Sequence, residues 1–452
     1  MFLISHLKFI YGLASFGKAL LWNASSLLFI FFLTETVGLE PAVAGTIISG
    51  SLVLNAFADL VAGRVMTRYV YTAATAARAQ FVGSVAAGIS FVAFTYAGHV
   101  PQASRLLYCI ATLTVFRIAY ATYDVPHNTY FALKATSDKE RFALASVRYI
   151  ASGAATLFLT ALTASWVRRT GLTQTGKSFE ANIETDFFLI SLALGVIAAG
   201  FSFLLHLAHA TTKTAPAPVT ANLIPDASAQ HTQPGPISPT YIYILLAMVA
   251  LSGTSPFFEK LEPYFSAYAS VDAVSALSFM TAVAIGKLAF QPLWAWLAGR
   301  YAPERLYTGA AVSMIAACLI FLLLSRQSPA LSLLSGILYG ATWGGVASYK
   351  WGLLAKSVAS DPAGATKWFG LFTFAAKLAH AGAVYGVGVV LQHIDYRDAT
   401  TGGDAIATLM VLPPLAGALI IVALSLRLTR LSPGSGQVRT RCADDKQSAP
   451  LI

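Results

Sequence analysis

The hydropathy of the chain alternates between long apolar runs and short polar segments. About 20 apolar residues, rising about 1.5 Å each, cross a hydrocarbon core of about 30 Å, so each run of that length predicts a membrane-spanning helix. Twelve runs reach this length, at residues 9–34, 42–65, 76–96, 106–131, 142–167, 187–209, 241–258, 273–297, 306–324, 331–355, 368–391 and 405–426. The pattern therefore predicts an all-α membrane protein.

The twelve runs form two sets of six, separated by a segment rich in Ala, Thr, Pro and Ser. Such a segment cannot bury enough apolar area to fold by itself. We predict an N-terminal six-helix half at 1–209, a flexible cytoplasmic linker at 210–239, a C-terminal six-helix half at 240–429 and a cytoplasmic tail at 430–452.

An internal repeat supports this division. A shift of 226 positions places Asp124 on Lys350, and a shift of 232 positions places Asp59 on Gln291. Polar positions inside apolar runs therefore align with other such positions, which favours two pseudosymmetric halves.

Composition and charge narrow the class of protein. Hydrophobic residues make up 56% of the chain and charged residues 11%, too little polar surface for a soluble fold of this size. The net charge of +10 comes from basic residues scattered singly, so we expect no nucleic-acid partner. Basic residues are concentrated in the loops on the side of the termini. The positive-inside rule then places both termini in the cytoplasm. We expect the membrane to be a bacterial-type inner (plasma) membrane.

Eight ionisable residues fall inside the apolar runs, namely Lys18, Asp59, Arg117, Asp124, Arg148, Lys287, Lys350 and Lys377. An ionised side chain facing lipid costs about 3 kcal/mol, so together they must line a polar interior or pair with one another. Interhelical pairing or snorkelling remains an equally good interpretation for Lys18 and Arg117. Basic residues outnumber acidic ones in this set, which favours an anionic solute such as a uronate, another carboxylate or a sulfonate.

Two of these acids suggest particular chemistry. Asn55 and Asp59 are four residues apart on one helix and share a face, where their oxygens can hold Na⁺ or the carboxylate can carry a proton. Asp124 precedes Pro126, which removes a backbone donor and should open the helix around the acid. A hydroxyl of a solute can bond there.

Several short motifs, in this order and at this spacing, resemble those of the glycoside-pentoside-hexuronide cation symporters, the family of the melibiose carrier. The likeness extends over nearly the whole chain, at residues 11–18, 55–59, 124–126, 138–148, 359–361 and 367–378. The resemblance implies the major facilitator fold, with twelve transmembrane helices in two pseudosymmetric six-helix halves. It also implies cation-coupled symport of a small polar solute by alternating access, with no cofactor beyond the coupling H⁺ or Na⁺.

The resemblance and the polar pattern together give a set of candidate residues. We predict cation ligands at Asn55, Asp59 and Thr122, and solute ligands at Asp124, Arg148, Lys350, Lys377 and Asn128. Cytoplasmic gating contacts are predicted at Arg68, Arg141, Arg300 and Asp361. The expected partners are a small-molecule solute and the lipid bilayer, with the protein as a monomer.

Three departures from the family pattern matter. Asn55 replaces a common aspartate and Ala121 a common threonine, which leaves H⁺ as well as Na⁺ open as the coupling ion. Ala19 replaces a common sugar-binding aspartate, which disfavours a melibiose-like disaccharide.

Two other function classes were weighed. An exporter or facilitator of an amphipathic natural product or lipid-like compound uses the same scaffold, and a cavity lined mainly by aromatic residues would favour it. A membrane enzyme is disfavoured, because the sequence has no paired-histidine metal motif, no Gly-x-Ser-x-Gly and no phosphate-binding loop. The solute, the coupling ion and the direction of transport stay open at this point.

Overall fold

The computed structural model describes residues 2–66, 69–70, 72–134, 138–174, 183–210, 239–269, 273–298, 300–358, 365–398 and 401–431. Within these ranges every regular element is a helix. Among the described residues, ten helices are long and apolar enough to cross a membrane, or eleven if the bent pair of helices at 6–36 counts as one span. The predicted all-α membrane fold is therefore confirmed.

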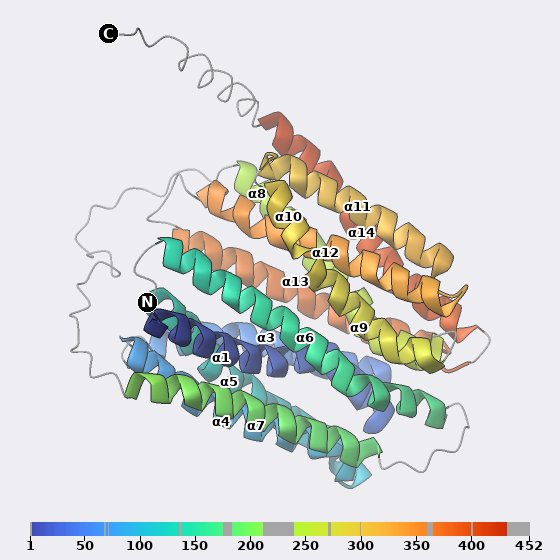
Figure 1. Ribbon diagram of the computed structural model, residues 1–452. Helices are drawn as coiled ribbons and strands as arrows, with labels where there is room; N and C mark the ends of the chain where they lie inside the picture. The colour runs from blue at the N-terminus through green and yellow to red at the C-terminus, as the bar shows by residue number, and fades with distance from the viewer. Residues whose placement is uncertain are drawn as a thin grey trace, which may run out of the picture.

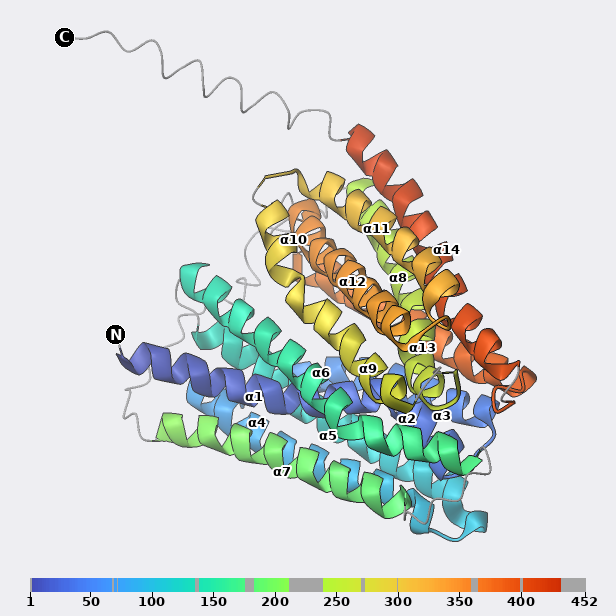
Figure 2. The same ribbon diagram turned by 45° about the vertical axis from the view of Figure 1, so that its right-hand side comes forward.

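The helices lie in two groups, one below the other in Figure 1 and again in the turned view of Figure 2. The first group contains α1 (Phe2–Leu27), α2 (Phe29–Phe31), η1 (Phe32–Thr36), α3 (Pro41–Met66), α4 (Ala73–Thr95), η2 (Tyr96–His99), α5 (Gln102–Lys134), α6 (Asp138–Gln174) and α7 (Ile183–Ala210). The second group contains α8 (Pro239–Tyr264), η3 (Phe265–Ala269), α9 (Ala273–Ala289), α10 (Gln291–Ala298), α11 (Pro303–Leu324), α12 (Pro329–Val358), α13 (Ala365–His393) and α14 (Gly402–Leu431). We call the end at which α1 begins the proximal end, and the end at which η1 leads into α3 the distal end.

Apolar side chains cover the outside of both groups. Ile89, Leu107, Val196 and Leu323 are each at least three-fifths exposed, as expected of surfaces that face acyl chains. Alanine, phenylalanine and small polar residues fill the interior instead. The outer surface is therefore apolar, and the buried polar residues lie among apolar ones inside the two groups.

Two breaks in regular helix shape the first group. α1 and the α2–η1 segment meet at a bend of 49°. Gly38, which has a φ of +78°, then lets the chain reverse into α3. These breaks turn Glu35, at the end of η1, toward the second group of helices.

Pro126 does not interrupt α5, in contrast to the predicted opening around Asp124. Because proline lacks an N–H, the carbonyl of Thr122, four residues earlier, has no helical donor. α4 comes so close here that a Cβ on Gly83 would overlap the Thr122 backbone. Close packing by a small residue therefore holds the helix together at this point.

The two groups touch through α3 with α13 and through α6 with α9. Near the distal end, Gly45 of α3 meets Gly388 of α13, and a Cβ on Gly45 would lie 2.8 Å from the Gly388 Cα. Only glycine allows this backbone approach without a shift of one helix. The distal ends are therefore packed tightly together.

Two predicted spans differ from the structure. The seventh was predicted to end at residue 258, but α8 continues to Tyr264 and η3 to Ala269. The eighth consists of two helices, α9 and α10, on either side of Phe290. Residues 211–238 and 432–452, which make up most of the predicted linker and tail, lie outside the described residues.

Candidate functional site

Asp59 and Lys377 form an ion pair that joins the two groups of helices. Asp59 lies on α3 and Lys377 on α13, and the Lys377 ammonium donates to Asp59 Oδ2. The side chains are 20% and 34% exposed, so neither is sealed into the packing. Two sequence-predicted residues from opposite halves are therefore partners, and water or a solute can reach the pair.

Two oxygens at this ion pair, one on Asn55 and one on Asp59, accept no hydrogen bond from the described residues. Asn55 Nδ2 donates weakly to Asp59 Oδ2, at 3.5 Å. Asn55 Oδ1 and Asp59 Oδ1 are buried without a hydrogen-bond partner. Two orphaned oxygens one helical turn apart fit an alkali cation or a proton. Thr122 donates instead to the Ala119 carbonyl in its own helix, so the described contacts do not join it to this pair.

A second ion pair links Lys18 of α1 to Asp124 of α5. Arg148 of α6 lies within electrostatic range of both side chains, and Lys377 within range of Asp124. The structure therefore brings Asp59, Asp124, Arg148 and Lys377 into one charged cluster. Lys18, for which the sequence left two interpretations open, is the direct counter-ion of Asp124.

The two remaining predicted solute ligands, Asn128 and Lys350, lie on α5 and α12. Asn128, one turn beyond Asp124 on α5, has a buried Oδ1 without a hydrogen-bond partner in the described part of the chain. Lys350 of α12 lies within electrostatic range of His380 on α13. Lys350 thus belongs to the second group's side of the interior.

The second group contributes charged residues that the sequence analysis did not recognise as buried. Glu259, Lys260 and Glu262 follow residue 258, where the seventh span was predicted to stop, and all lie within α8. Lys260 and Glu262 are almost fully buried. The apolar and aromatic residues that continue after them, such as Leu261 and Phe265, were the available signal. The interior therefore contains more carboxylates than predicted, which weakens the argument for an anionic solute.

Arg117 of α5 is only 1% exposed, and it contacts side chains of the neighbouring helices. Its guanidinium donates to the hydroxyls of Ser51 on α3, at 3.1 Å, and Ser25 on α1, at 3.3 Å. It also lies 5.5 Å from the centre of the Phe116 ring. Arg117 therefore ties three helices of the first group together, the interhelical alternative that the sequence left open.

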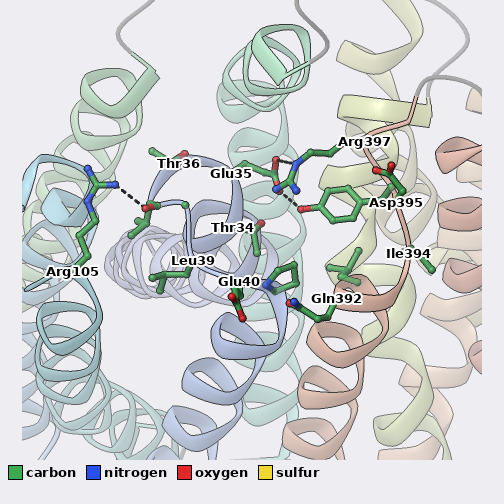
Figure 3. A pocket seen from close by; sticks show the side chains of 15 residues that line it. Thr34, Glu35, Thr36, Leu39, Glu40, Arg105, Gln392, Ile394, Asp395 and Arg397 are labelled. Carbon is green, nitrogen blue, oxygen red and sulfur yellow. Dashed lines mark hydrogen bonds and ion pairs between the residues drawn. The ribbon is translucent and has the colours of Figure 1, made fainter. Parts of the chain in front are cut away.

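At the distal end, the carboxylate of Glu35 is surrounded by donors from the second group (Figure 3). Tyr396 Oη donates to Glu35 Oε1 at 2.6 Å, and an Arg397 nitrogen lies 3.0 Å from the same oxygen. Tyr268 of η3 donates to Oε2. Glu35 itself is inaccessible to solvent. We call these four residues the distal closure.

Electrostatics support this arrangement. Burial, and then the Glu35 carboxylate, raise the pKa of Tyr396, so its hydroxyl keeps the proton that it donates. Burial acts to lower the pKa of Arg397, but Glu35, Tyr396 and Tyr268 together outweigh it and raise that pKa above its ordinary value. A cavity of about 540 Å³ beside the closure is lined by Glu40, Arg105 and others.

Of the four predicted gating residues, the structure describes only the side chain of Arg300. Arg300 is exposed and stacks on Trp296, with 3.7 Å between its guanidinium carbon and the ring centre. Arg68 and Asp361 lie outside the described residues, as does the side chain of Arg141. One contact between the halves that the structure does describe is the distal closure, which was not predicted because Glu35 follows the end of an apolar run.

Comparison with known proteins agrees with this fold and this polar interior. A family model described as MFS/sugar transport protein matches residues 10–432. The chain belongs to this family. Its resemblance to the glycoside-pentoside-hexuronide cation symporters and its major facilitator fold are thereby confirmed, and it is a multi-pass membrane protein.

Two relatives carry symporter names. A protein of Escherichia coli (strain K12), "Putative glycoside/cation symporter YagG", is 25% identical over 152 residues, which are 34% of this chain and 33% of that protein. "Uncharacterized symporter YjmB" of Bacillus subtilis (strain 168) is 23% identical over 160 residues, 34% of each chain. The chain thus matches about a third of the length of these relatives.

Solved structures share the fold across nearly the whole chain. The inward open xylose transporter XylE from E. coli superposes with a TM-score of 0.65 at 15% identity, covering 92% of this chain and 95% of that one. A structure of proton dependent oligopeptide transporters gives a TM-score of 0.65 at 12% identity, covering 94% and 99%. At these identities the likeness concerns the fold alone.

Proposed function

We propose that this chain is a cation-coupled symporter of a small polar solute, a sugar or sugar acid, that works by alternating access. The observation that carries the proposal is the Asp59–Lys377 pair, which crosses between the two groups of helices beside two unsatisfied oxygens. Family membership and the symporter names of the relatives support the same class of function.

The pair suggests how coupling works. A cation or proton that binds Asp59 neutralises the carboxylate and releases Lys377. Lys377 lies within electrostatic range of Asp124, so the released ammonium can bind a solute held near Asp124 and Arg148. An ammonium left without a partner is costly inside the membrane, so the halves close only when both cation and solute are bound or both are absent.

The remaining candidates take roles around this pair. We assign Asn55 and Thr122 to the cation with Asp59, and Asn128 and Lys350 to the solute with Asp124, Arg148 and Lys377. Arg68, Arg141, Arg300 and Asp361 are proposed as gating residues of the other, cytoplasmic side.

The distal closure fits one state of the cycle. With the termini in the cytoplasm of a bacterial-type inner membrane, the distal end faces outward. Glu35 then closes the outer side against Tyr396 and Arg397. The two groups of helices are the halves that rock about the interior site, joined by the segment at 210–239.

A counterflow assay tests the proposal. Purified protein in proteoliposomes is given neutral and acidic sugars, with and without Na⁺, at two pH values. Exchange of at least one sugar that depends on Na⁺ or on pH supports symport. Exchange of amphipathic compounds but of no sugar, independent of both ions, would favour the exporter or facilitator instead.

A further inference from the structure

The carboxylate of Glu259 is bonded across the two groups of helices. Ser26, near the end of α1, donates to Glu259 Oε1 at 2.8 Å. The Lys260 ammonium donates to the same serine oxygen at 3.1 Å. The Ser26 oxygen accepts a hydrogen bond from Lys260, so the Ser26 hydroxyl donates its own proton to Glu259. The hydrogen bond therefore joins α1 of the first group to α8 of the second.

Glu259 has binding capacity left over. Its side chain is 26% exposed, whereas its neighbour Lys260 is almost completely enclosed. No described residue donates to Glu259 Oε2. An ionised carboxylate offers about four acceptor positions, so most of this group's capacity is unused. The exposed part belongs to a residue that contacts α1, so Glu259 lies at the boundary between the groups.

The surroundings of Glu259 are basic. Lys260, Lys287 and His380 all lie within its electrostatic range. An ionised carboxylate accepts hydrogen bonds, and the neighbouring ammonium groups donate them. A hydroxyl group both donates and accepts, and it finds an acceptor in Glu259 and donors beside it.

The first group presents a similar carboxylate. Asp124 is 24% exposed and is held by Lys18, as Glu259 is held near Lys260. A solute between the groups would therefore meet one partly satisfied carboxylate on each side. Such an arrangement suits several hydroxyls on one molecule and repels a compact dianion.

We infer that Glu259 is a second solute-binding carboxylate, which exchanges its hydrogen bond from Ser26 for a hydroxyl of a polyhydroxylated solute. The inference rests on the proposed function, and it adds a recognition residue on α8. Because the exchange removes a bond between α1 and α8, binding of the solute also loosens a contact between the halves.

The test compares two variants that this exchange affects in opposite directions. Glu259→Gln replaces the charged acceptor and should weaken binding of a hydroxyl-rich solute on the order of 10- to 100-fold. Ser26→Ala removes the competing donor while keeping the carboxylate, so binding should stay equal or tighten. A merely structural contact would make both variants worse. Glu262→Gln, on the same helix and without a described bond to α1, serves as the matched control.

Binding is measured on detergent-purified protein as stabilisation against thermal unfolding by xylose, galactose, glucuronate and galacturonate. The inference predicts a loss of sugar stabilisation in E259Q, retention or gain in S26A, and wild-type behaviour in E262Q. Equal affinity of E259Q and the wild type would overturn it while leaving the proposed function intact. If E259Q does not fold, weaker sugar binding by S26A overturns it instead. If no sugar of the panel stabilises the wild type, the proposed function fails, and this inference fails with it.

Discussion

The ammonium of Lys377 on α13 pairs with the carboxylate of Asp59 on α3, so one charge from each group of helices neutralises the other inside the membrane. The pair lies in the charged cluster that includes Asp124. It thus connects the proposed cation site to the proposed solute site through a single side chain.

Removing either partner should destabilise the protein more than removing both. Asp59→Asn leaves the Lys377 ammonium without its carboxylate, and Lys377→Gln leaves Asp59 unpaired, each at about 1.5–3 kcal/mol. The double variant D59N/K377Q removes both charges and should recover most of that loss. Thermal unfolding in detergent measures the cycle, and additive losses in the double variant would show that the pair contributes no coupling energy.

The distal closure should depend on Arg397. Arg397→Gln removes the cation that bonds Glu35, which should cost about 1–2 kcal/mol and shift the closing equilibrium by a factor of about 5–30. A cysteine replacing Thr36, which lines the adjacent cavity, reports on the opening through its labelling rate with a membrane-impermeant maleimide. The background protein has its three natural cysteines replaced.

A matched control for this experiment lies in the same cavity. Arg105 donates to the carbonyls of Val37 and Gly98, so its bonds stay within the first group of helices. Arg105→Gln should therefore leave the labelling rate near that of the parent. Equal rates in the Arg397 variant and the parent would contradict a closure built on Glu35.

The glycine contact between α3 and α13 should be sensitive to one methyl group. Gly45→Ala places a Cβ 2.8 Å from the Gly388 Cα, so the distal ends must move apart, at about 1–3 kcal/mol. Gly50→Ala on the same helix meets nothing within 4 Å and should be silent. The same labelling assay checks both, and an unchanged rate in G45A would show that the distal ends need not pack so closely.

The charge of the solute can be tested at Lys350. If this ammonium binds an acidic group, Lys350→Gln should reduce counterflow of glucuronate far more than that of galactose, on the order of tenfold. An equal loss of counterflow for the neutral and the acidic sugar would show that Lys350 does not recognise the charge of the solute. The carboxylates found on α8 predict that neutral sugars still bind in this variant.

Much of the fold could be predicted from the sequence, because a run of about 20 apolar residues has few alternatives to a membrane span. Asn55 and Asp59 could be placed on one face of a helix from their spacing alone. The pairing of Lys18 with Asp124 could not be predicted, since it depends on the rotation and contact of two helices 106 positions apart in the chain.

The end of α8 was missed for a specific physical reason. Charged residues ordinarily mark the end of a span, yet Glu259 and Lys260 continue this one, and Ser26 of α1 bonds both of them. Glu35 follows residue 34, where the first span was predicted to end, although donors from the second group enclose it. In each case the compensating partner lies in the other half of the chain, so the sequence around the charged residue does not indicate it.

The most direct test of coupling through Asp59 is uptake into proteoliposomes against a concentration gradient, driven by an imposed Na⁺ or H⁺ gradient. The probe is a sugar that the wild type exchanges in counterflow. We expect the wild type to accumulate this sugar, whereas Asp59→Asn exchanges it without accumulation. Accumulation by D59N at the wild-type level would contradict coupling through Asp59.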